Sequence, residues 1–293
     1  MNKYICIDVG GTSIKHSIIN ENKEIIESSQ IPTNAHLGGD VIINNIKNIV
    51  STYLKQNNNT VFLGIAISTT GMVDPNRGSI IHTSPLTPGY MGCEIKKEIE
   101  TSFNIPCEAE NDVNCAGLGE MWTGAGKGYK NIICITVGTG IGACLIIDNK
   151  LVNGVTNSAG EIGYIKINNK DLQDISATSV LVKNIQNLKN DNTIDGKEVF
   201  DMAKKGDKEC INEIYKMIEN LCIGISNILY IINPEILIIG GAITKQKEYL
   251  MPIIIENLNK YVHKHIIDKT KIEFAQNENN AGMIGALYNL LHK

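Results

Sequence analysis

Short apolar runs separated by glycine or polar turns make up the first part of the chain. The run over Tyr4–Val9 predicts a buried strand, Gly10–Thr12 a tight turn, and Ser13–Ile19 a second strand. Polar residues at 20–23 predict a further turn, and Glu24–Ile31 predicts a third strand. The chain therefore begins with a strand, a glycine turn and a returning strand.

A helical pattern comes next. Asp40 can cap a helix, and apolar residues then recur at helical spacing on one face. These residues are Val41, Ile42, Ile46, Ile49, Val50, Tyr53 and Leu54. The run Val61–Ile67 predicts a fourth strand, which leads into the small-residue loop Ser68–Gly71.

The opening pattern occurs a second time. Asn131–Val137 predicts a strand, Gly138–Gly140 a turn and Ile141–Ile147 a strand. Further predicted elements are helices over Ala177–Leu188, Gly196–Lys205, Lys208–Ile232 and Ala281–His292, and a strand over Glu235–Ile239. This weak internal repeat predicts two α/β lobes, with ligands bound in a cleft between them.

The lobe boundary is expected near residues 108–112, since no low-complexity linker separates the two repeats. We assign residues 1–110 to an N-terminal α/β lobe and residues 111–293 to a C-terminal α/β lobe. The last helix, at about 281–292, is expected to pack back on the N-terminal lobe.

Composition narrows the class of protein. The chain has 293 residues, of which 43% are hydrophobic and 20% are charged, and this excludes disorder as the main state. A net charge of −4 argues against a nucleic-acid partner, because such proteins usually carry a basic face. Arg77 is the only arginine, so a phosphate group would be held by backbone N–H groups, lysine or a metal ion.

Eight cysteines are present, and no two of them are in a C-x₂₋₄-C spacing. Several lie inside apolar runs, as Cys134 does, which predicts buried thiols in a reducing, cytoplasmic compartment. Asp8 ends the first apolar run too early for a signal peptide. Asn233–Glu235 interrupts the longest apolar stretch, Ile228–Ile243, so no segment is expected to cross a membrane.

Both glycine turns can bind an anion. Glycines let backbone N–H groups approach a phosphate, Thr12 can add a hydroxyl and Lys15 a charge, and Asp8 can hold Mg²⁺ directly or through water. The alternative is a hairpin turn that needs glycine for its dihedral angles. Neither turn is a P-loop, and no helix opens after either one as in a dinucleotide-binding fingerprint. Gly240 and Gly241 either touch a nucleotide or form a simple turn after their strand.

A polar cluster, Glu110–Asn114, lies at the start of a predicted helix over Val113–Trp122. Asp112 either caps this helix or acts as a general base for a substrate hydroxyl. Asn111 beside it can donate and accept hydrogen bonds, which suits a sugar hydroxyl.

Several motifs that occur in a fixed order resemble the ROK family of bacterial sugar kinases and repressors. They are Asp8–Thr12, Glu110–Asn114, Val137–Gly142, Ala159–Gly163, Asn233–Glu235 with Gly240–Gly241, and Ala281–Ala286. The resemblance covers essentially the whole chain.

The resemblance implies an α/β, two-lobed actin-like ATPase (ribonuclease H-like) fold, with ATP and Mg²⁺ in its cleft and phosphoryl transfer to a hexose hydroxyl. It implies that Asp112 is the catalytic base and that Asn111, Glu161 and Gly71 contact the sugar. The residues implied for ATP are Gly10, Gly11, Thr12, Gly138 and Thr139 at the phosphates, Gly240 and Gly241 near the adenosine and Asp8 near Mg²⁺. Lys15 is added to the expected ATP site for its charge alone.

The chain departs from the family pattern at residue 164. Many members have a histidine there and a three-cysteine zinc cluster after it, whereas this chain has Tyr164 and no cysteine or histidine over 164–200. Zinc needs three or four such ligands at close spacing, so we predict no zinc. Tyr164 either offers its hydroxyl to the sugar or serves only in packing. Gln173 and Asp174 are both candidates for a further sugar contact.

A second departure concerns DNA. Repressors of the family carry a helix-turn-helix module before the first phosphate turn, and here the first strand begins at about Tyr4, so we expect a kinase. The resemblance favours N-acetylmannosamine as the sugar, with β-glucoside kinase or glucokinase activity as the alternative. A catalytically silent sugar sensor is an alternative of another class. Family members are commonly dimers, so a homodimer is expected.

Overall fold

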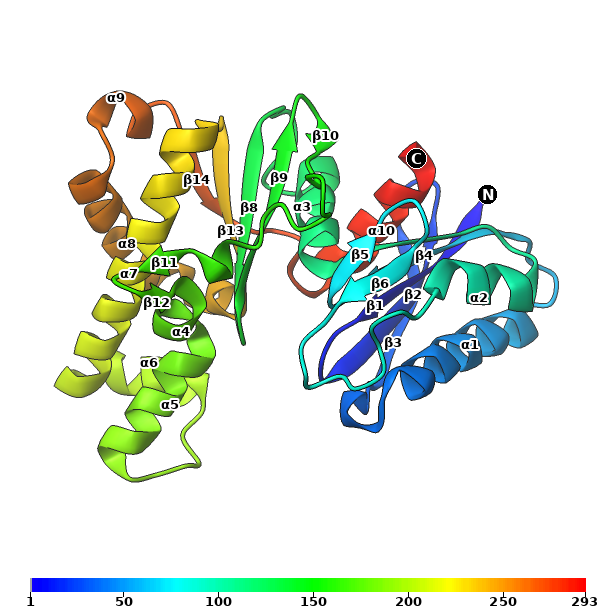
Figure 1. The fold of residues 1–293 in the computed structure, drawn as a ribbon, viewed down its shortest axis with the longest axis horizontal. Coiled ribbons are helices and arrows are strands. Elements are labelled where there is room, and N and C mark those ends of the chain that lie inside the picture. Colours follow the sequence, from blue (N-terminus) through cyan, green and yellow to red (C-terminus); the bar gives the residue numbers. More distant parts are fainter. Residues whose placement is uncertain (1) are drawn as a thin grey trace. The chain divides into compact units, whose positions relative to one another are not determined.

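The computed structural model describes residues 2–293, and their contacts divide the chain into two compact units. Unit 1 consists of the chain up to residue 127 together with residues 151–159 and 279–293. Unit 2 consists of residues 128–150 and 160–278. Each unit combines helices with a five-stranded sheet (Figure 1).

Unit 1 is built on a mixed sheet with the strand order β3-β2-β1-β4-β7. Its strands are β1 (Lys3–Val9), β2 (Ser13–Asn20), β3 (Ile25–Pro32), β4 (Phe62–Thr69) and β7 (Cys107–Asn111), and a separate hairpin is formed by β5 (Met72–Asp74) and β6 (Ser79–His82). Its helices are η1 (Ala35–Leu37), α1 (Gly39–Gln56), α2 (Ile95–Phe103), α3 (Asp112–Thr123) and α10 (Ala281–His292). Strands β1, β4 and β7 are parallel, and β2 and β3 are antiparallel to their neighbours.

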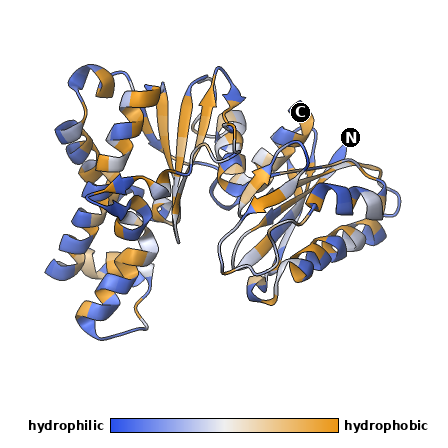
Figure 2. Cartoon of the chain, viewed as in Figure 1, coloured by the Kyte–Doolittle hydropathy of each residue, from blue (hydrophilic) through white to orange (hydrophobic). Residues whose placement is uncertain are grey.

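The alternation of side chains along β1 separates two cores on the two faces of this sheet. Ile5, Ile7 and Val9 are fully buried in the core that includes α1 and α2. Tyr4 and Cys6 point the other way, into a core that includes α10. Figure 2 shows apolar residues following the strands of both sheets. Because both faces of the unit 1 sheet are covered, a polar side chain inside a strand, such as that of Asp8, needs a specific explanation.

Helices α3 and α10 pack closely because glycines lie where they meet. A Cβ atom on Gly285 would lie 1.7 Å from the carbonyl oxygen of Cys115, and one on Gly119 would lie 2.5 Å from that of Ala281. Neither position accepts a larger residue unless the backbone shifts. The last helix therefore lies in unit 1, where it also contacts β1 and β4. The same packing assigns α3 to unit 1, whereas the boundary expected at residues 110 and 111 puts this helix in the C-terminal lobe.

Unit 2 contains a sheet with the strand order β10-β9-β8-β13-β14. Its strands are β8 (Ile132–Val137), β9 (Ile141–Ile147), β10 (Lys150–Leu151), β13 (Ile236–Gly241) and β14 (Lys271–Phe274), with a small pair β11 (Lys166–Ile167) and β12 (Lys170–Asp171). Its helices are η2 (Ile162–Tyr164), α4 (Leu172–Ser176), α5 (Thr178–Lys189), α6 (Gly196–Lys204), α7 (Lys208–Ile232), η3 (Ala242–Gln246), α8 (Lys247–Tyr261) and α9 (Lys264–Ile267), and η4 (Glu278–Asn280) precedes α10. Strands β8, β13 and β14 are parallel, and β9 is antiparallel to β8.

Some elements differ from the sequence-based prediction. Helices α2 and α8, the β5–β6 hairpin and β14 are present but were not predicted. Helix α8 contains Pro252, a residue that a pattern-based prediction treats as a helix breaker. Helix α1 has Gly38 as its N-cap, so Asp40 lies in the first turn and does not cap it. No helix within residues 2–293 is long and apolar enough to cross a membrane.

Candidate functional site

Three parallel strands of unit 1 end at the same edge of the sheet, and their registers bring polar side chains together there. Asp8 on β1 pairs with Ser68 on β4, which in turn pairs with Glu110 on β7. Residues in one row of a sheet point to the same face. The turn Gly10–Thr12 follows β1 at this edge, and Gly71 follows β4. The carboxyl ends of parallel strands are where ligands usually bind in open α/β sheets.

Asp8 is surrounded by groups that hold its carboxylate in place. Ser68 Oγ donates a hydrogen bond to Asp8 Oδ1 over 2.6 Å. Lys15 lies opposite Asp8 in the β1–β2 ladder, and its Nζ donates to Asn279 Oδ1 over 3.1 Å. Burial raises the pKa of Asp8, and the Ser68 hydrogen bond and the Lys15 charge oppose that rise. Gly282 makes room for the carboxylate, because a Cβ atom on Gly282 would lie 2.6 Å from Asp8 Oδ1.

The glycine turn after β1 leaves open space beside one of its residues. The N–H of Gly10 donates to Ser13 O over 3.1 Å and closes the turn. A Cβ atom on Gly11 would meet no atom of the described chain within 4 Å, and Gly11 is outside the left-handed region. Neither packing nor backbone strain therefore requires glycine at this position. The open space leaves room for close approach of a ligand, and the predicted phosphate contact of this turn stays a prediction.

Asn111 and Asp112 lie where β7 passes into α3. Asn111 is the N-cap of this helix, since its Oδ1 accepts hydrogen bonds from the N–H groups of Val113 and Asn114 over 2.9 and 3.0 Å. The capping role that the sequence suggested for Asp112 therefore belongs to Asn111. Asp112 is the first helical residue, and its Oδ1 accepts from Asn111 Nδ2 over 3.0 Å. The helix dipole favours a negative charge at this position.

Asn111 also ties the loop after β4 to this junction. Its Nδ2 donates to the carbonyl oxygen of Gly71 over 2.9 Å. Gly71 has a φ of 94°, and a Cβ atom there would lie 2.8 Å from the carbonyl oxygen of His82, so the backbone itself requires glycine. Asn111 Oδ1 and Nδ2 are thus both bonded within the chain, and Asn111 orients Asp112.

Glu110 is a buried carboxyl group directly before this pair. It is 2% exposed, and its Oε1 accepts from the N–H of Asn111 over 2.8 Å and from Asn114 Nδ2 over 3.1 Å. Its Oε2 has no hydrogen-bond partner among the described residues. Burial raises the pKa of Glu110, and the two hydrogen bonds oppose that rise.

In unit 2, the parallel strands β8 and β13 also end together, with Val137 paired to Gly241. Gly241 has a φ of 88°, and a Cβ atom there would lie 2.4 Å from the carbonyl oxygen of Val137. A Cβ atom on Gly240, by contrast, would make only ordinary contacts, at 3.5 Å or more from the neighbouring atoms. The approach of the two strands therefore requires glycine at 241 but not at 240.

The turn after β8 resembles the turn after β1. A Cβ atom on Gly138 would meet no atom of the described chain within 4 Å, and Gly138 does not have a left-handed φ. Thr139 beside it is exposed. Gly138 and Gly11 thus share one property, an open space that the described chain does not fill, and both lie in turns predicted to bind phosphate.

Glu161 and Tyr164 belong to one short turn of unit 2. Glu161 is the N-cap residue of η2, and Tyr164 is its last residue. The turn lies against β9, because a Cβ atom on Gly163 would be 2.4 Å from the carbonyl oxygen of Ile141. The Tyr164 side chain is 52% exposed, so Tyr164 is not a core residue. Its exposure does not fit the packing interpretation, and contact of its hydroxyl with a sugar stays a prediction.

Gln173 lies next to both of these unit 2 turns. Its Oε1 would be 2.9 Å from a Cβ atom on Gly163 and 3.2 Å from one on Gly140. Asp174, the other candidate from the sequence, is exposed on α4. Gln173 is therefore the candidate that connects the Glu161 turn with the turn after β8.

The residues present fit a magnesium ion that is bound mainly by phosphate. Among residues 2–293, no three His, Cys, Asp or Glu side chains are grouped so that they could hold a metal ion. Mg²⁺ usually keeps several water molecules and binds one or two carboxylates together with substrate phosphates. Asp8, at the strand end before the open turn at Gly11, fits this requirement. The absence of zinc stays a prediction.

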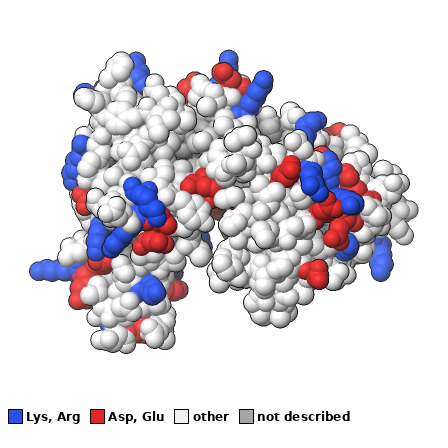
Figure 3. Space-filling view, viewed as in Figure 1, with Lys and Arg blue, Asp and Glu red and all other residues white. Residues whose placement is uncertain are grey.

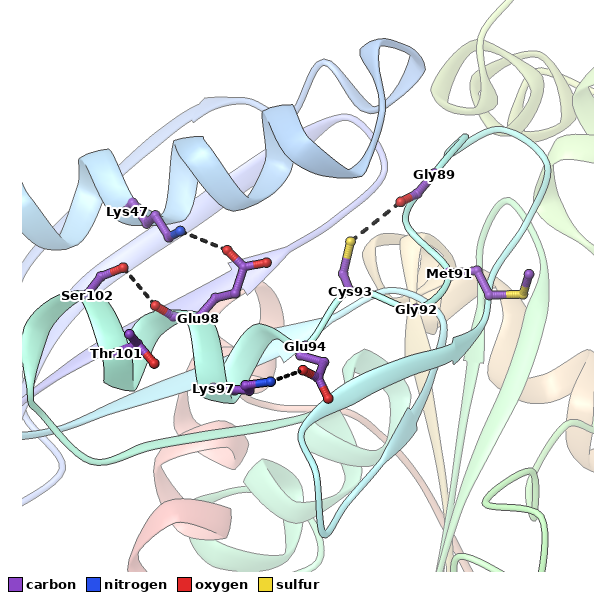
Figure 4. A pocket seen from close by; sticks show the side chains of 10 residues that line it. All are labelled: Lys47, Gly89, Met91, Gly92, Cys93, Glu94, Lys97, Glu98, Thr101 and Ser102. Atoms are coloured by element: carbon purple, nitrogen blue, oxygen red, sulfur yellow. Dashed lines mark hydrogen bonds and ion pairs between the residues drawn. The ribbon is translucent and has the colours of Figure 1, made fainter.

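One hollow in unit 1 is separate from the predicted site residues of that unit. It has a volume of about 660 Å³ and is formed by α1, α2 and the loop between β6 and α2 (Figure 4). The ion pairs Lys47–Glu98 and Lys97–Glu94, with lengths of 2.8 and 2.7 Å, line it. None of the predicted site residues is among its lining residues. On the face seen in Figure 3, basic side chains are interspersed with acidic ones and form no continuous basic patch.

Two residues of these clusters had no site role predicted from the sequence. Ser68 binds Asp8, and Glu110 binds Asn111. The spacing of Ser68 and Glu110 along the sequence carries no sign of their proximity, because only the strand order places β4 between β1 and β7. Glu110 had one local signal, since it belongs to the polar cluster Glu110–Asn114 before a predicted helix.

Comparison with known proteins agrees with the motifs. The chain matches the sequence profile of the ROK family over residues 4–293. An uncharacterized protein of Clostridium perfringens is 47% identical over 291 residues, which cover 99% of this chain and 98% of that protein. A beta-glucoside kinase of Listeria innocua is 30% identical, and the match covers 99% of this chain and 98% of that protein.

A solved structure has the same fold. It is a protein of Listeria monocytogenes described as "a putative N-acetylmannosamine kinase", which is 28% identical and superposes with a TM-score of 0.86. The match covers 99% of this chain and 98% of that one. The predicted α/β class with an actin-like ATPase fold is therefore confirmed.

Proposed function

This chain belongs to the ROK family, and from this we propose that it is an ATP-dependent sugar kinase. The reaction proposed is transfer of the γ-phosphoryl group of ATP to the 6-hydroxyl group of a hexose. The oxygen of that hydroxyl forms a bond to the γ-phosphorus, the bond from this phosphorus to the bridging oxygen breaks, and ADP leaves.

The observation that carries the proposal is the position of Asp112. This carboxylate lies at the sheet edge that also holds Asp8 and the open turn at Gly11, and Asn111 holds it by a hydrogen bond of 3.0 Å. Phosphoryl transfer needs an oriented acceptor hydroxyl, a group that takes its proton, and donors for the phosphate oxygens. The edge of the unit 1 sheet offers two of these, the Asp112 carboxylate for the proton and the N–H groups of the turn at Gly11 for the phosphate oxygens, and the sugar brings the hydroxyl.

Each proposed residue has a separate task. Asp112 accepts the proton of the attacking hydroxyl, and Asn111 keeps Asp112 in place. The backbone N–H groups of Gly11, Thr12 and Thr139 donate to phosphate oxygens, while Gly240 and Gly241 lie near the adenosine. Gly10 and Gly138 shape the two turns, since their own N–H groups donate to Ser13 O and Gly140 O over 3.1 and 3.0 Å. Lys15 adds positive charge. Mg²⁺ at Asp8, when bound, neutralises charge on the phosphates.

The sugar hydroxyls are proposed to meet Asn111, Glu161, Tyr164 and the loop at Gly71. The substrate we propose is N-acetylmannosamine, which is supported by the description of the solved Listeria monocytogenes structure. The alternative is a β-glucoside, supported by the relative from Listeria innocua, or glucose. A coupled assay of ADP release over N-acetylmannosamine, N-acetylglucosamine, glucose and a disaccharide β-glucoside separates these substrates. Release confined to the β-glucoside or to glucose overturns the choice of N-acetylmannosamine.

Replacing Asp112 tests the mechanism directly. We expect Asp112→Asn to lose at least about 10²-fold in turnover, because a general base contributes about that factor, and to keep the sugar-dependent rise in Tm. Asp207→Asn is a matched control, since Asp207 is also a carboxylate at a helix N-terminus, where it caps α7. Near-normal turnover of Asp112→Asn removes Asp112 from the mechanism.

The silent sugar sensor is the competing function. A sensor would show a sugar-dependent rise in Tm without any release of ADP. Asp112 and the open space at Gly11 and Gly138 have no use in such a protein, which is why we favour the kinase. The proposal includes a cytoplasmic location, where ATP is available, and a homodimer, which size-exclusion chromatography with light scattering tests.

A further inference from the structure

Two carbonyl groups of the first glycine turn, those of Gly10 and Thr12, accept hydrogen bonds from Thr33. This residue follows β3 and is fully buried. Its Oγ1 donates a hydrogen bond to the carbonyl oxygen of Gly10 over 2.6 Å, and its backbone N–H donates to that of Thr12 over 3.0 Å. The second bond continues the β2–β3 ladder, whereas the first depends on the side chain alone.

The second glycine turn is held in the same manner by Ser179. This residue lies in the first turn of α5. Its Oγ donates a hydrogen bond to the carbonyl oxygen of Thr139 over 2.7 Å. Its backbone N–H donates to the carbonyl oxygen of Gly138 over 3.4 Å. In both units, a hydroxyl residue outside the turn therefore gives its side chain and its backbone N–H to two carbonyl groups of the turn.

These bonds fix the direction of the backbone N–H groups in each turn. A trans peptide is planar, and its C=O group points opposite to the N–H of the following residue. When Thr33 holds the carbonyl of Gly10, the N–H of Gly11 is directed away from Thr33. When Ser179 holds the carbonyl of Thr139, the N–H of Gly140 is directed away from α5. A set of N–H groups fixed on one side of a turn is what a phosphate-binding nest requires.

We propose that Thr33 and Ser179 are positioning residues for nucleotide phosphates, each acting through the glycine turn that it holds. The inference rests on the proposed kinase function. Neither residue is proposed to touch the ligand. Their hydroxyl groups keep the N–H groups of the two turns oriented before the phosphate arrives, so less binding free energy is spent on ordering the backbone.

Two side-chain deletions test the proposal, and each has a conservative rescue. Thr33→Val and Ser179→Ala remove the hydroxyl, and Thr33→Ser and Ser179→Thr restore it. Thr270→Val and Ser102→Ala are the matched controls, because each deletes a hydroxyl that donates to a carbonyl oxygen outside both turns. The Thr270 hydroxyl donates to Pro234 O over 3.2 Å, and the Ser102 hydroxyl donates to Glu98 O over 2.7 Å.

The measurements are calorimetric affinity for Mg·ADP and the sugar-dependent rise in Tm. We expect Thr33→Val and Ser179→Ala each to weaken Mg·ADP binding by about three- to tenfold, the range that one oriented hydrogen bond supports. The sugar-dependent rise in Tm should be unchanged, the rescue variants should bind like the wild type, and the controls should not differ from it. A merely structural role would lower Tm in deletions and controls alike and leave the affinity of the folded protein unaltered.

The possible failures are distinguishable. If the wild type binds Mg·ADP and both deletions bind it with wild-type affinity, the positioning role is wrong and the kinase proposal stands. If the wild type does not bind Mg·ADP, the kinase proposal fails and the inference fails with it. Should Thr33→Val not fold, Ser179→Ala decides the matter, because Ser179 is exposed and tolerates truncation.

Discussion

At the scale of single residues, the glycines of the candidate site fall into two kinds. Gly71 and Gly241 have left-handed φ angles and would each bring a Cβ atom within 3 Å of a carbonyl oxygen, so the fold requires them. Gly11 and Gly138 have neither property, and the described chain leaves space beside them. Substitution at the second kind therefore reports on ligand binding, whereas substitution at the first kind reports on folding.

Gly138→Ala is the corresponding prediction. The added methyl group meets no atom of residues 2–293 within 4 Å, so Tm should stay within about 2 °C of the wild type. A methyl group in the path of a phosphate should weaken Mg·ADP binding roughly tenfold or more. Gly196→Ala is the matched control, since a Cβ atom there makes only ordinary contacts, at 3.6 Å and beyond. Equal nucleotide affinity in Gly138→Ala and the control would show that this turn does not hold phosphate.

Glu110 predicts a pH dependence of stability. Burial raises its pKa in the folded state, so the folded protein keeps a proton that the unfolded chain has already lost. The stabilisation from the protonated group is complete below the unfolded pKa and is lost as pH rises through the folded pKa. Glu110→Gln has no such proton, and its amide can keep the hydrogen bonds that Asn111 and Asn114 donate to Oε1.

We therefore expect the Tm of Glu110→Gln to increase relative to the Tm of the wild type when the pH is raised from 5 to 8. The measurement is the difference in Tm between the two proteins across that range. A difference that is constant with pH would mean that Glu110 does not change its protonation state on folding.

At the scale of elements, helix α10 has two glycines with different neighbours. Gly282 faces the carboxylate of Asp8, at 2.6 Å from a built Cβ atom, and Gly285 faces the backbone of Cys115, at 1.7 Å. A side chain can move away from a new methyl group more easily than a helix backbone can. The two positions therefore separate an effect on the site from an effect on packing.

Gly282→Ala is expected to displace Asp8 and to weaken Mg·ADP binding roughly tenfold, with only a small change in Tm. Gly285→Ala is expected to force α3 and α10 apart and to lower the free energy of unfolding by about 2 kcal/mol or more, as overpacking does in a closely packed contact. Denaturant unfolding and calorimetric titration of both variants check this. The prediction would be wrong if Gly282→Ala were the less stable variant and bound Mg·ADP with wild-type affinity.

Several elements were predictable from the sequence, and others were not. The strands before both glycine turns and helix α7 follow from runs of apolar residues and from helical periodicity. Helix α8 was not predicted because Pro252 lies inside it, although Leu250, Ile254 and Leu258 recur at helical spacing. The N-cap of α3 was ambiguous because Asn111 and Asp112 are both good capping residues, and only the backbone geometry at the end of β7 selects Asn111.

At the scale of the whole molecule, the absence of a zinc requirement is testable on the intact protein. Residues 164–200 contain no cysteine or histidine, so zinc has no ligand set in the segment where the family places it. We expect dialysis against EDTA to leave Tm unchanged, and addition of Mg²⁺ alone to restore full activity. Metal analysis should find far less than one zinc ion per chain. Recovery of activity only after zinc is added would overturn the prediction.

The sequence by itself determined the turns, the apolar strands, the order of the motifs and hence the family. These are local properties, since hydrophobic periodicity and glycine content are read along the chain. Only the tertiary structure decided that Asp8, Ser68 and Glu110 share one row, that α3 belongs to unit 1, and that Gln173 rather than Asp174 touches two turns. Strand order and helix packing depend on burial between residues far apart in the chain, and no local pattern encodes which strand ends will meet.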